Sequence, residues 1–224
     1  MEISWLSHAC FQLRGKNATL ITDPFSPQSG ESLLLSKISP SIVTLSHTPS
    51  GLSTTLSIGG TPYIVRGPGE YEISDVLITG IADNHDDKDG KERRRNTIYI
   101  IHIDDLVVCH LGALGQTLQE EQLEAVADAD VLLLPIGDHH TIHATQAAEL
   151  VSQVEPRIVI PFYLTAPIEN APVPGAGSGR DATDTLSKFC REMGIQTVNP
   201  QPKINVSRTN IPTETQVVLL SPRQ

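Results

Sequence analysis

The first half of the chain alternates between short apolar runs and turn residues. The runs are ISWL, CFQL, ATLIT, SIVTL, PYIV, EYEI, VLIT, TIYIIHI and LVVCH. Glycine and proline clusters separate several of them, as at residues 59–62 and 67–69. Runs of this length bounded by turn residues are typical of β-strands. The pattern therefore predicts a mostly antiparallel sheet in this half.

The second half changes to apolar strands that alternate with helical stretches. A capping box predicts a helix from Thr117 to about Ala127, and Thr141 is placed to begin a second helix that runs to about Val154. The apolar runs VLLLP and RIVI follow these helices and read as buried strands. Strand and helix alternate here as βαβαβ, which is the pattern of a parallel sheet.

The last part of the chain begins with a stretch rich in proline, glycine and alanine at residues 165–181. This composition predicts a surface loop rather than a linker between domains. A third helix is expected over about residues 183–193, and Gly194 suits its end. The segments KINVSRTN and QVVLL, separated by a turn, predict a terminal hairpin.

The totals restrict the classes of protein to consider. A chain of 224 residues is long enough for one substantial core, and we expect a single domain over 1–224. The net charge is -10 and the sequence pI is about 5.2. The 16 basic residues form no long stripe. A nucleic-acid partner is therefore not expected.

Cysteine usage and the chain start indicate the compartment. Cys10, Cys109 and Cys190 form no C-x-x-C pair, and two of them lie in apolar runs where a thiol packs as a small hydrophobic group. The chain starts directly with strand-like alternation, and no apolar segment reaches the length of about 18 residues that a membrane span needs. We expect a cytoplasmic protein with no membrane partner.

Several chemistry-bearing motifs follow one another along nearly the whole chain. They are WLSHACF at 5–11, LITDPF at 20–25, TLSH at 44–47, RGPGEYEI at 66–73, ITGIADNHDD at 78–87, CHLGALG at 109–115 and RIVIPFY at 157–163. Together they resemble the metallo-β-lactamase superfamily, and in particular its branch of small bacterial zinc-dependent hydrolases similar to ascorbate-phosphate lactonase. The resemblance implies an αββα sandwich, in which helices flank two mixed β-sheets and the active site lies at one edge.

The resemblance also implies metal ligands, and the chain departs from that pattern. The family holds one or two ions through a His-x-His-x-Asp-His loop, a further His, a bridging Asp and a late His. His47 and His110 match two of these positions and are remnant ligands. Five of about seven expected ligands are replaced, by Pro49, Gly51, Leu52, Ala113 and Tyr163. Because a catalytic zinc normally keeps three protein ligands, no metal is expected at the inherited site.

Other residues match positions of the family pocket or form a new cluster. By the resemblance, His8, His85 and Tyr163 line the pocket, and Asp23 commonly orients a metal-bound His. A separate run, Asp138-His139-His140-Thr141-Ile142-His143, follows the strand VLLLP. If Thr141 caps the helix, His143 lies in the first turn, where the helix dipole favours a neutral ring that can bind metal.

Three functional hypotheses follow. The first is a scaffold that has lost the dinuclear hydrolase activity and keeps a role in small-molecule binding or assembly. The second is an active hydrolase with a rebuilt mononuclear site made of His47, His110 and one or more of His139, His140 and His143. Imidazole ligands suit zinc or another transition metal at such a site. The third is a metal-free acid/base enzyme that uses His8, His85 or Asp23. The substrate and the oligomeric state, including a homo-oligomer, stay open.

Overall fold

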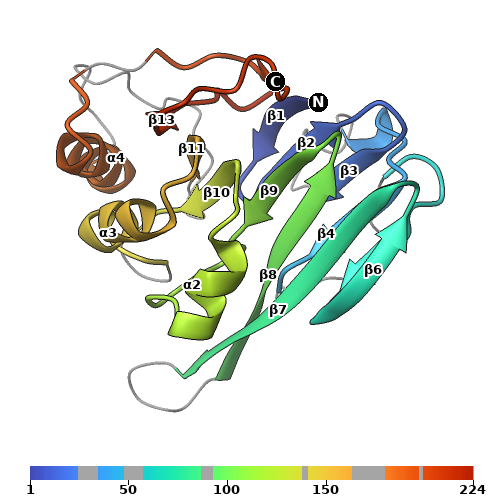
Figure 1. Ribbon diagram of the computed structural model, residues 1–224, viewed down its shortest axis with the longest axis horizontal. Helices are drawn as coiled ribbons and strands as arrows, with labels where there is room; N and C mark the ends of the chain where they lie inside the picture. Colours follow the sequence, from blue (N-terminus) through green and yellow to red (C-terminus); the bar gives the residue numbers. More distant parts are fainter. Residues whose placement is uncertain are drawn as a thin grey trace.

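The fold is a sandwich of two mixed β-sheets. The computed structural model describes residues 1–24, 35–47, 58–86, 93–137, 141–162, 180–196 and 199–223. Figure 1 shows the second sheet in front of the first, with the labelled helices gathered on one side. Among the described helices, none is long and apolar enough to cross a membrane.

The first sheet contains strands from the first half of the chain and one strand from the tail. Its spatial order is β12 (Ile204–Asn205), β1 (Glu2–Ser7), β2 (Cys10–Arg14), β3 (Thr19–Thr22), β4 (Ile42–Leu45) and β5 (Tyr63–Arg66). The β12, β1, β2 and β3 neighbours are antiparallel, whereas β3, β4 and β5 run parallel to one another. Mostly antiparallel pairing was predicted for the first half of the chain and is confirmed, with β3–β4 and β4–β5 as the parallel exceptions.

The second sheet joins the two halves of the chain. Its order is β13 (Gln216–Val217), β11 (Ile158–Phe162), β10 (Val131–Pro135), β9 (Leu106–His110), β8 (Arg93–Ile103), β7 (Val76–Asp86) and β6 (Gly69–Ile73). Strands β6 to β9 form an antiparallel meander, and β9, β10 and β11 are parallel. The βαβαβ pattern is therefore confirmed, as are the two mixed sheets.

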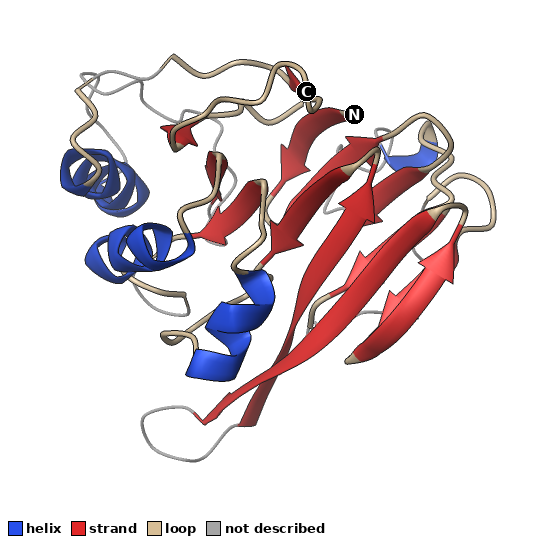
Figure 2. Cartoon of the chain, viewed as in Figure 1, coloured by secondary structure: helices blue, strands red, loops and turns tan. Residues whose placement is uncertain are grey.

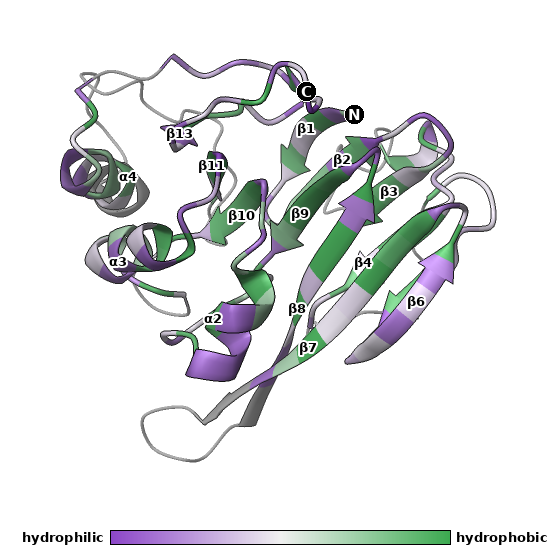
Figure 3. Ribbon diagram, in the orientation of Figure 1, coloured by the Kyte–Doolittle hydropathy of each residue, from purple (hydrophilic) through white to green (hydrophobic). Residues whose placement is uncertain are grey.

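The main core lies between the sheets, and strand alternation decides which residues enter it. On β1, Ile3 and Trp5 belong to the main core, whereas Leu6 belongs to a smaller cluster on the other face of the sheet. Phe11 of β2 meets Phe162 of β11 edge to face, with ring centroids 5.3 Å apart. The two sheets therefore contact each other through aromatic side chains. Figure 3 shows the hydrophobic residues along β9 and the hydrophilic residues on α2 and β6.

The cysteines pack inside the protein as predicted. Cys10, Cys109 and Cys190 are all buried and form no disulfide. Burial raises the pKa of the Cys109 thiol far above its ordinary value, because the thiolate loses its hydration. All three thiols are buried, which agrees with the prediction that a thiol in an apolar run packs as a small hydrophobic group.

Three helices cover the outer face of the second sheet: α2 (Glu120–Val126), α3 (Ala144–Val154) and α4 (Arg180–Glu192) (Figure 2). On the first sheet, the part of the chain that the structure describes contributes a helical turn at 35–36, where Leu35 joins the smaller apolar cluster. The predicted helices exist, but two start later than expected. Gln119 rather than Thr117 is the N-cap of α2, and His143 rather than Thr141 is the N-cap of α3.

The C-terminal tail does not form the predicted hairpin. Instead, β12 pairs antiparallel with β1 in the first sheet, and β13 pairs parallel with β11 in the second. The tail therefore covers one edge of each sheet (Figure 1). An unpaired sheet edge offers a full row of hydrogen-bonding groups to any strand that lies beside it. Both short strands pair with these edges rather than with each other.

Candidate functional site

The candidate site forms where strands of both sheets end. Asp23 follows β3, Ser46 and His47 follow β4, and His110 is the last residue of β9. The parallel pairing of β3 with β4 places Thr22 opposite Thr44, so the residues after these strands lie side by side. The backbone N–H of Asp23 donates to the Thr44 carbonyl at 2.9 Å, and Asp23 adopts a left-handed φ of 34°. Strand ends therefore bring the carboxylate and the two imidazoles together.

Asp23 and Ser46 form a two-point contact. The Ser46 backbone N–H donates to Asp23 Oδ1 at 2.6 Å, and the Ser46 hydroxyl contacts Asp23 Oδ2. The same hydroxyl oxygen lies 2.9 Å from Nδ1 of His47. Asp23 Oδ2 is 3.8 Å from that Nδ1, which is too long for a hydrogen bond. Ser46 is therefore the link between the carboxylate and the ring.

His110 is the most deeply buried of these side chains. Its side chain has 0% exposure, and neither ring nitrogen has a hydrogen-bond partner among the described residues. The ring stacks on Phe162 with centroids 5.7 Å apart. Burial lowers the pKa of His110 below its ordinary value, and the Asp23 carboxylate, whose Oδ2 is 4.0 Å from Nδ1, opposes this only in part. His110 is therefore a neutral ring with unsatisfied nitrogens.

A second polar network lies beside this cluster, and the sequence analysis did not predict it. Asn96 on β8 donates through Nδ2 to Asp83 Oδ2 at 3.1 Å and to the Leu111 carbonyl at 3.0 Å. Its Oδ1 accepts the backbone N–H of Ala113 at 2.9 Å. Asp83 is fully buried. The sequence signal is a polar residue, Asn96, immediately before the apolar run TIYIIHI and another, Asp83, at the end of ITGIAD.

Gly112 brings the two networks into contact. Its φ is +60°, and a Cβ atom built there would lie 2.3 Å from Asn96 Oδ1 and 2.6 Å from the Ser46 Cβ. The Ser46 carbonyl also accepts the Thr97 backbone N–H at 2.7 Å. Direct protein contacts thus join the ends of β4, β8 and β9 at this point.

Other residues predicted for the pocket are less well defined. His8 lies in the turn between β1 and β2 with a left-handed φ of 48°, and its carbonyl accepts the Trp5 indole N–H at 2.7 Å. His85 lies on β7 opposite Arg94. His143 is exposed at the start of α3, where its backbone N–H donates to Gln146 Oε1 at 3.1 Å.

The expectation that His143 lies within the first helical turn is therefore wrong. His143 is the N-cap, its N–H donates to the Gln146 side chain, and the helix itself begins at the next residue, Ala144. The remaining expectations fall outside the described residues. These concern Pro49, Gly51, Leu52, His139, His140 and Tyr163. Ala113 is described and carries only a methyl group, in the loop after β9.

The geometry of the described donors can be tested against a zinc ion. Two atoms bound to one tetrahedral zinc at about 2.0–2.1 Å lie about 3.3 Å apart. Asp23 Oδ2 lies 3.8 Å from Nδ1 of His47 and 4.0 Å from Nδ1 of His110. That oxygen is also occupied by the Ser46 hydroxyl. Within the described ranges, no group of three His, Cys, Asp or Glu side chains is placed to hold a metal ion. Asp23 Oδ2 is too far from either Nδ1 atom to share one tetrahedral zinc with it.

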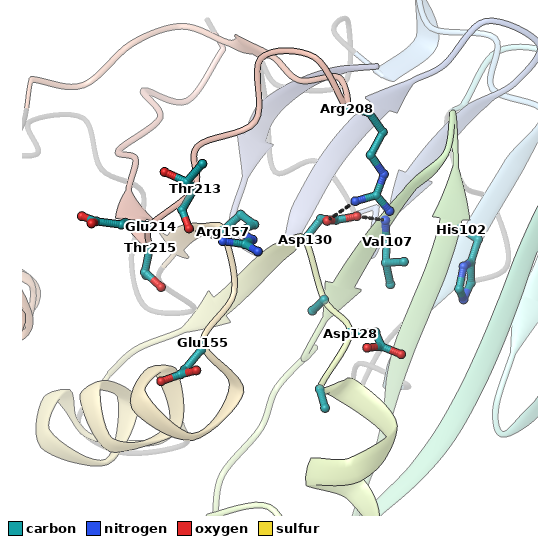
Figure 4. A pocket seen from close by; sticks show the side chains of 12 residues that line it. His102, Val107, Asp128, Asp130, Glu155, Arg157, Arg208, Thr213, Glu214 and Thr215 are labelled. Atoms are coloured by element: carbon teal, nitrogen blue, oxygen red, sulfur yellow. Dashed lines mark hydrogen bonds and ion pairs between the residues drawn. The ribbon is translucent and has the colours of Figure 1, made fainter.

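A second hollow lies at the opposite ends of β9, β10 and β11. Its volume is about 710 Å³, and its lining includes Asp130, Arg157 and Arg208 (Figure 4). Arg208 pairs with Asp130 at 2.7 Å, and the other Asp130 oxygen accepts the Val107 N–H at 2.8 Å. Arg157 donates to the Thr213 carbonyl. Since these groups hold the C-terminal segment in place, the hollow is a structural feature of the tail rather than a rival site.

Comparison with other protein sequences gives relatives that are similar over most of the chain. A UPF0173 metal-dependent hydrolase of Thermoplasma acidophilum is 28% identical over 188 residues, covering 73% of this chain and 83% of that protein. A second, from Pyrococcus horikoshii, is 28% identical over 195 residues, covering 73% and 84%. Both names describe metal-dependent hydrolases.

Solved structures show the same architecture. A Thermotoga maritima protein, described as a Zn-dependent hydrolase of the metallo-beta-lactamase superfamily, superposes with a TM-score of 0.74 at 24% identity and covers 99% of each chain. The beta-lactamase superfamily domain matches residues 2–163, which is more than half of the chain. The chain therefore belongs to the metallo-β-lactamase superfamily.

Proposed function

We propose that this protein has lost the standard dinuclear metal site of its superfamily, and with it the hydrolase activity that depends on two ions. The relatives are named metal-dependent hydrolases, so the ancestral chemistry is hydrolysis assisted by metal. The protein keeps the scaffold and part of the pocket. Small-molecule binding or assembly is the remaining role of such a scaffold.

The observation that carries this proposal is the environment of Ala113. By the resemblance, this position belongs to the carboxylate that bridges two ions. Here the side chain is a methyl group, and the backbone N–H is held by Asn96 Oδ1 at 2.9 Å. Two adjacent divalent ions carry four positive charges and need acidic oxygen between them. Proline, glycine and leucine at positions 49, 51 and 52 remove further donors.

Metal analysis tests the proposal directly. The protein is purified without chelator from medium supplemented with zinc, and its metal content is measured by plasma mass spectrometry alongside hydrolysis of lactone and phosphodiester substrates. We expect well under one equivalent of transition metal and no metal-dependent turnover. Two equivalents of metal, together with turnover that a chelator abolishes, would refute it.

One observation favours the second candidate, a rebuilt mononuclear site. Both nitrogens of His110 are buried with no hydrogen-bond partner among the residues that the structure describes, and an unsatisfied buried polar group costs about 1–3 kcal/mol. A ligand on one of these nitrogens removes that cost. The remaining imidazoles would come from His47 and from the run 139–143, of which the structure describes His143 at the start of α3.

This candidate predicts one equivalent of zinc or another transition metal that is lost in His110→Ala and in a His139→Ala/His140→Ala double variant. His102→Ala removes an exposed histidine on β8 and is the matched control. Retention of the metal in both test variants would exclude the rebuilt site.

A further inference from the structure

We propose that Ser46 is a positioning residue that transmits the charge of Asp23 to His47 and fixes its ring as the tautomer protonated at Nδ1, leaving Nε2 as an unprotonated acceptor. The inference goes beyond the proposed function, because it gives the surviving pocket a defined hydrogen-bond acceptor. It rests on the proposed function in one respect only, namely that no ion occupies Nε2.

Counting protons along the contact gives this assignment. An ionised carboxylate only accepts hydrogen bonds, and a serine hydroxyl has one proton to donate. The Ser46 N–H already donates to Asp23 Oδ1 at 2.6 Å, and the Ser46 hydroxyl meets Asp23 Oδ2. The hydroxyl proton is therefore directed to the carboxylate. Ser46 Oγ then has only lone pairs to offer the His47 Nδ1 atom 2.9 Å away, so Nδ1 must carry the proton.

Asp23 and His47 are too far apart for a direct hydrogen bond, so the Ser46 hydroxyl must connect them. Asp23 Oδ2 lies 3.8 Å from Nδ1 of His47, beyond the range of a hydrogen bond. Asp23 therefore acts on the ring through Ser46 rather than by direct contact. Ser46 itself has 2% exposure, so it is closed to a substrate and is not a nucleophile.

The role of His47 depends on which of its two ring nitrogens is unprotonated. In a neutral imidazole one nitrogen donates and the other accepts. With Nδ1 protonated, Nε2 accepts a hydrogen bond from a hydroxyl, amide or water of a small-molecule ligand. The His47 side chain is 29% exposed, so it is open to such a ligand, whereas the His110 side chain is closed at 0%. His47 is thus the hydrogen-bonding ring of this pocket that a ligand can approach.

The Asp23→Asn substitution tests the proposal, because it is expected to move the ring proton of His47 from Nδ1 to Nε2. The Ser46 N–H fixes the orientation of the new amide, because its oxygen must stay at the Oδ1 position to accept that N–H. The NH₂ group then replaces Oδ2 and donates to the Ser46 oxygen. The hydroxyl proton is released toward Nδ1 of His47, and the ring must move its own proton to Nε2. The substitution keeps the shape of the side chain and inverts the tautomer.

The measurement is a long-range ¹H–¹⁵N correlation spectrum of the imidazole rings, recorded in slightly alkaline buffer on chelator-treated protein whose metal content is checked in the same sample. Protonated and unprotonated ring nitrogens have widely separated shifts. We expect Nδ1–H in the wild type and in Ser46→Thr, Nε2–H in Asp23→Asn, and loss of the single tautomer in Ser46→Ala. The exposed ring of His143 is the internal reference.

A wild-type ring protonated at Nε2, or an Asp23→Asn ring unchanged from the wild type, would overturn the inference. If Ser46→Ala fails to fold, the comparison of wild type, Ser46→Thr and Asp23→Asn still decides it. Metal found in the protein before chelation would contradict the proposed function, whereas the tautomer is assigned on the chelated sample that contains no metal.

Discussion

The side-chain oxygen of Asn96 accepts the backbone N–H of Ala113 at 2.9 Å, and this contact fixes the loop after β9 against β8. The same amide donates to Asp83, which is fully buried, and to the Leu111 carbonyl. One side chain thus satisfies three groups from two different parts of the chain.

Asn96→Ala is expected to lower the free energy of unfolding by about 3 kcal/mol, because it leaves a buried carboxylate and a backbone N–H with fewer partners. Urea denaturation measures the change. Asn17→Ala is the control, since the Asn17 amide donates to Asp75 at 3.1 Å on an exposed surface and should cost under about 0.5 kcal/mol. Equal costs for the two variants would show that the network contributes no special stability.

Gly112→Ala separates steric clash from backbone strain when it is compared with Gly194→Ala. Both glycines have left-handed φ values, +60° and +69°, but a Cβ at Gly112 meets Asn96 and Ser46, whereas a Cβ at Gly194 meets nothing within 4 Å. The Gly194 variant should lose about 1 kcal/mol from the left-handed conformation alone. The Gly112 variant should lose at least about 2 kcal/mol more, as overpacking costs in a rigid interior. If urea denaturation gives similar losses of unfolding free energy for the two variants, backbone strain alone explains the loss and the steric clash contributes nothing.

His110 should make the protein less stable as the pH falls through the ordinary range of histidine. Burial lowers the pKa of the folded ring, so the unfolded chain binds a proton that the folded protein does not. Stability is then full above the unfolded pKa of about 6.5 and declines below it, with a slope of up to about 1.4 kcal/mol per pH unit.

Urea denaturation at several pH values between about 5 and 8 measures this slope. His110→Phe should flatten it, whereas His102→Asn, which replaces an exposed histidine on β8, should leave it unchanged. A wild-type slope that survives in His110→Phe would assign the effect to other groups.

Chelation should leave the stability of the protein unchanged. The ends of β4 and β8 are joined directly, since the Thr97 N–H donates to the Ser46 carbonyl at 2.7 Å, and no described contact needs an ion between them. We expect the same urea midpoint with and without EDTA. An ion that is bound at a hundred times its dissociation constant would add about 2.7 kcal/mol, so a clear drop on chelation would reveal a structural metal.

Local patterns predicted the elements, and contacts between distant segments decided their partners. The strand VLLLP was found as Val131–Pro135, because an apolar run between two helices has few alternatives. The helix starts shifted because Gln122 and Gln146 cap α2 and α3 through side chains that a serine or threonine pattern does not include. The tail strands were predicted to pair with each other, but pairing depends on which sheet edge lies nearest, and no local pattern records that.

The sequence by itself determined the superfamily and the side-chain chemistry at the positions that resemble its metal ligands, since alanine at 113 and proline, glycine and leucine at 49, 51 and 52 carry no side-chain donor in any fold. Only the tertiary structure decided how the surviving donors are used. It buries His110 against Phe162, spaces Asp23 from the His47 ring by 3.8 Å, and inserts the Ser46 hydroxyl between them. Residue identity fixes which atoms can bind a proton or an ion. Distance and burial, which arise from strands far apart in the chain, fix which of them do.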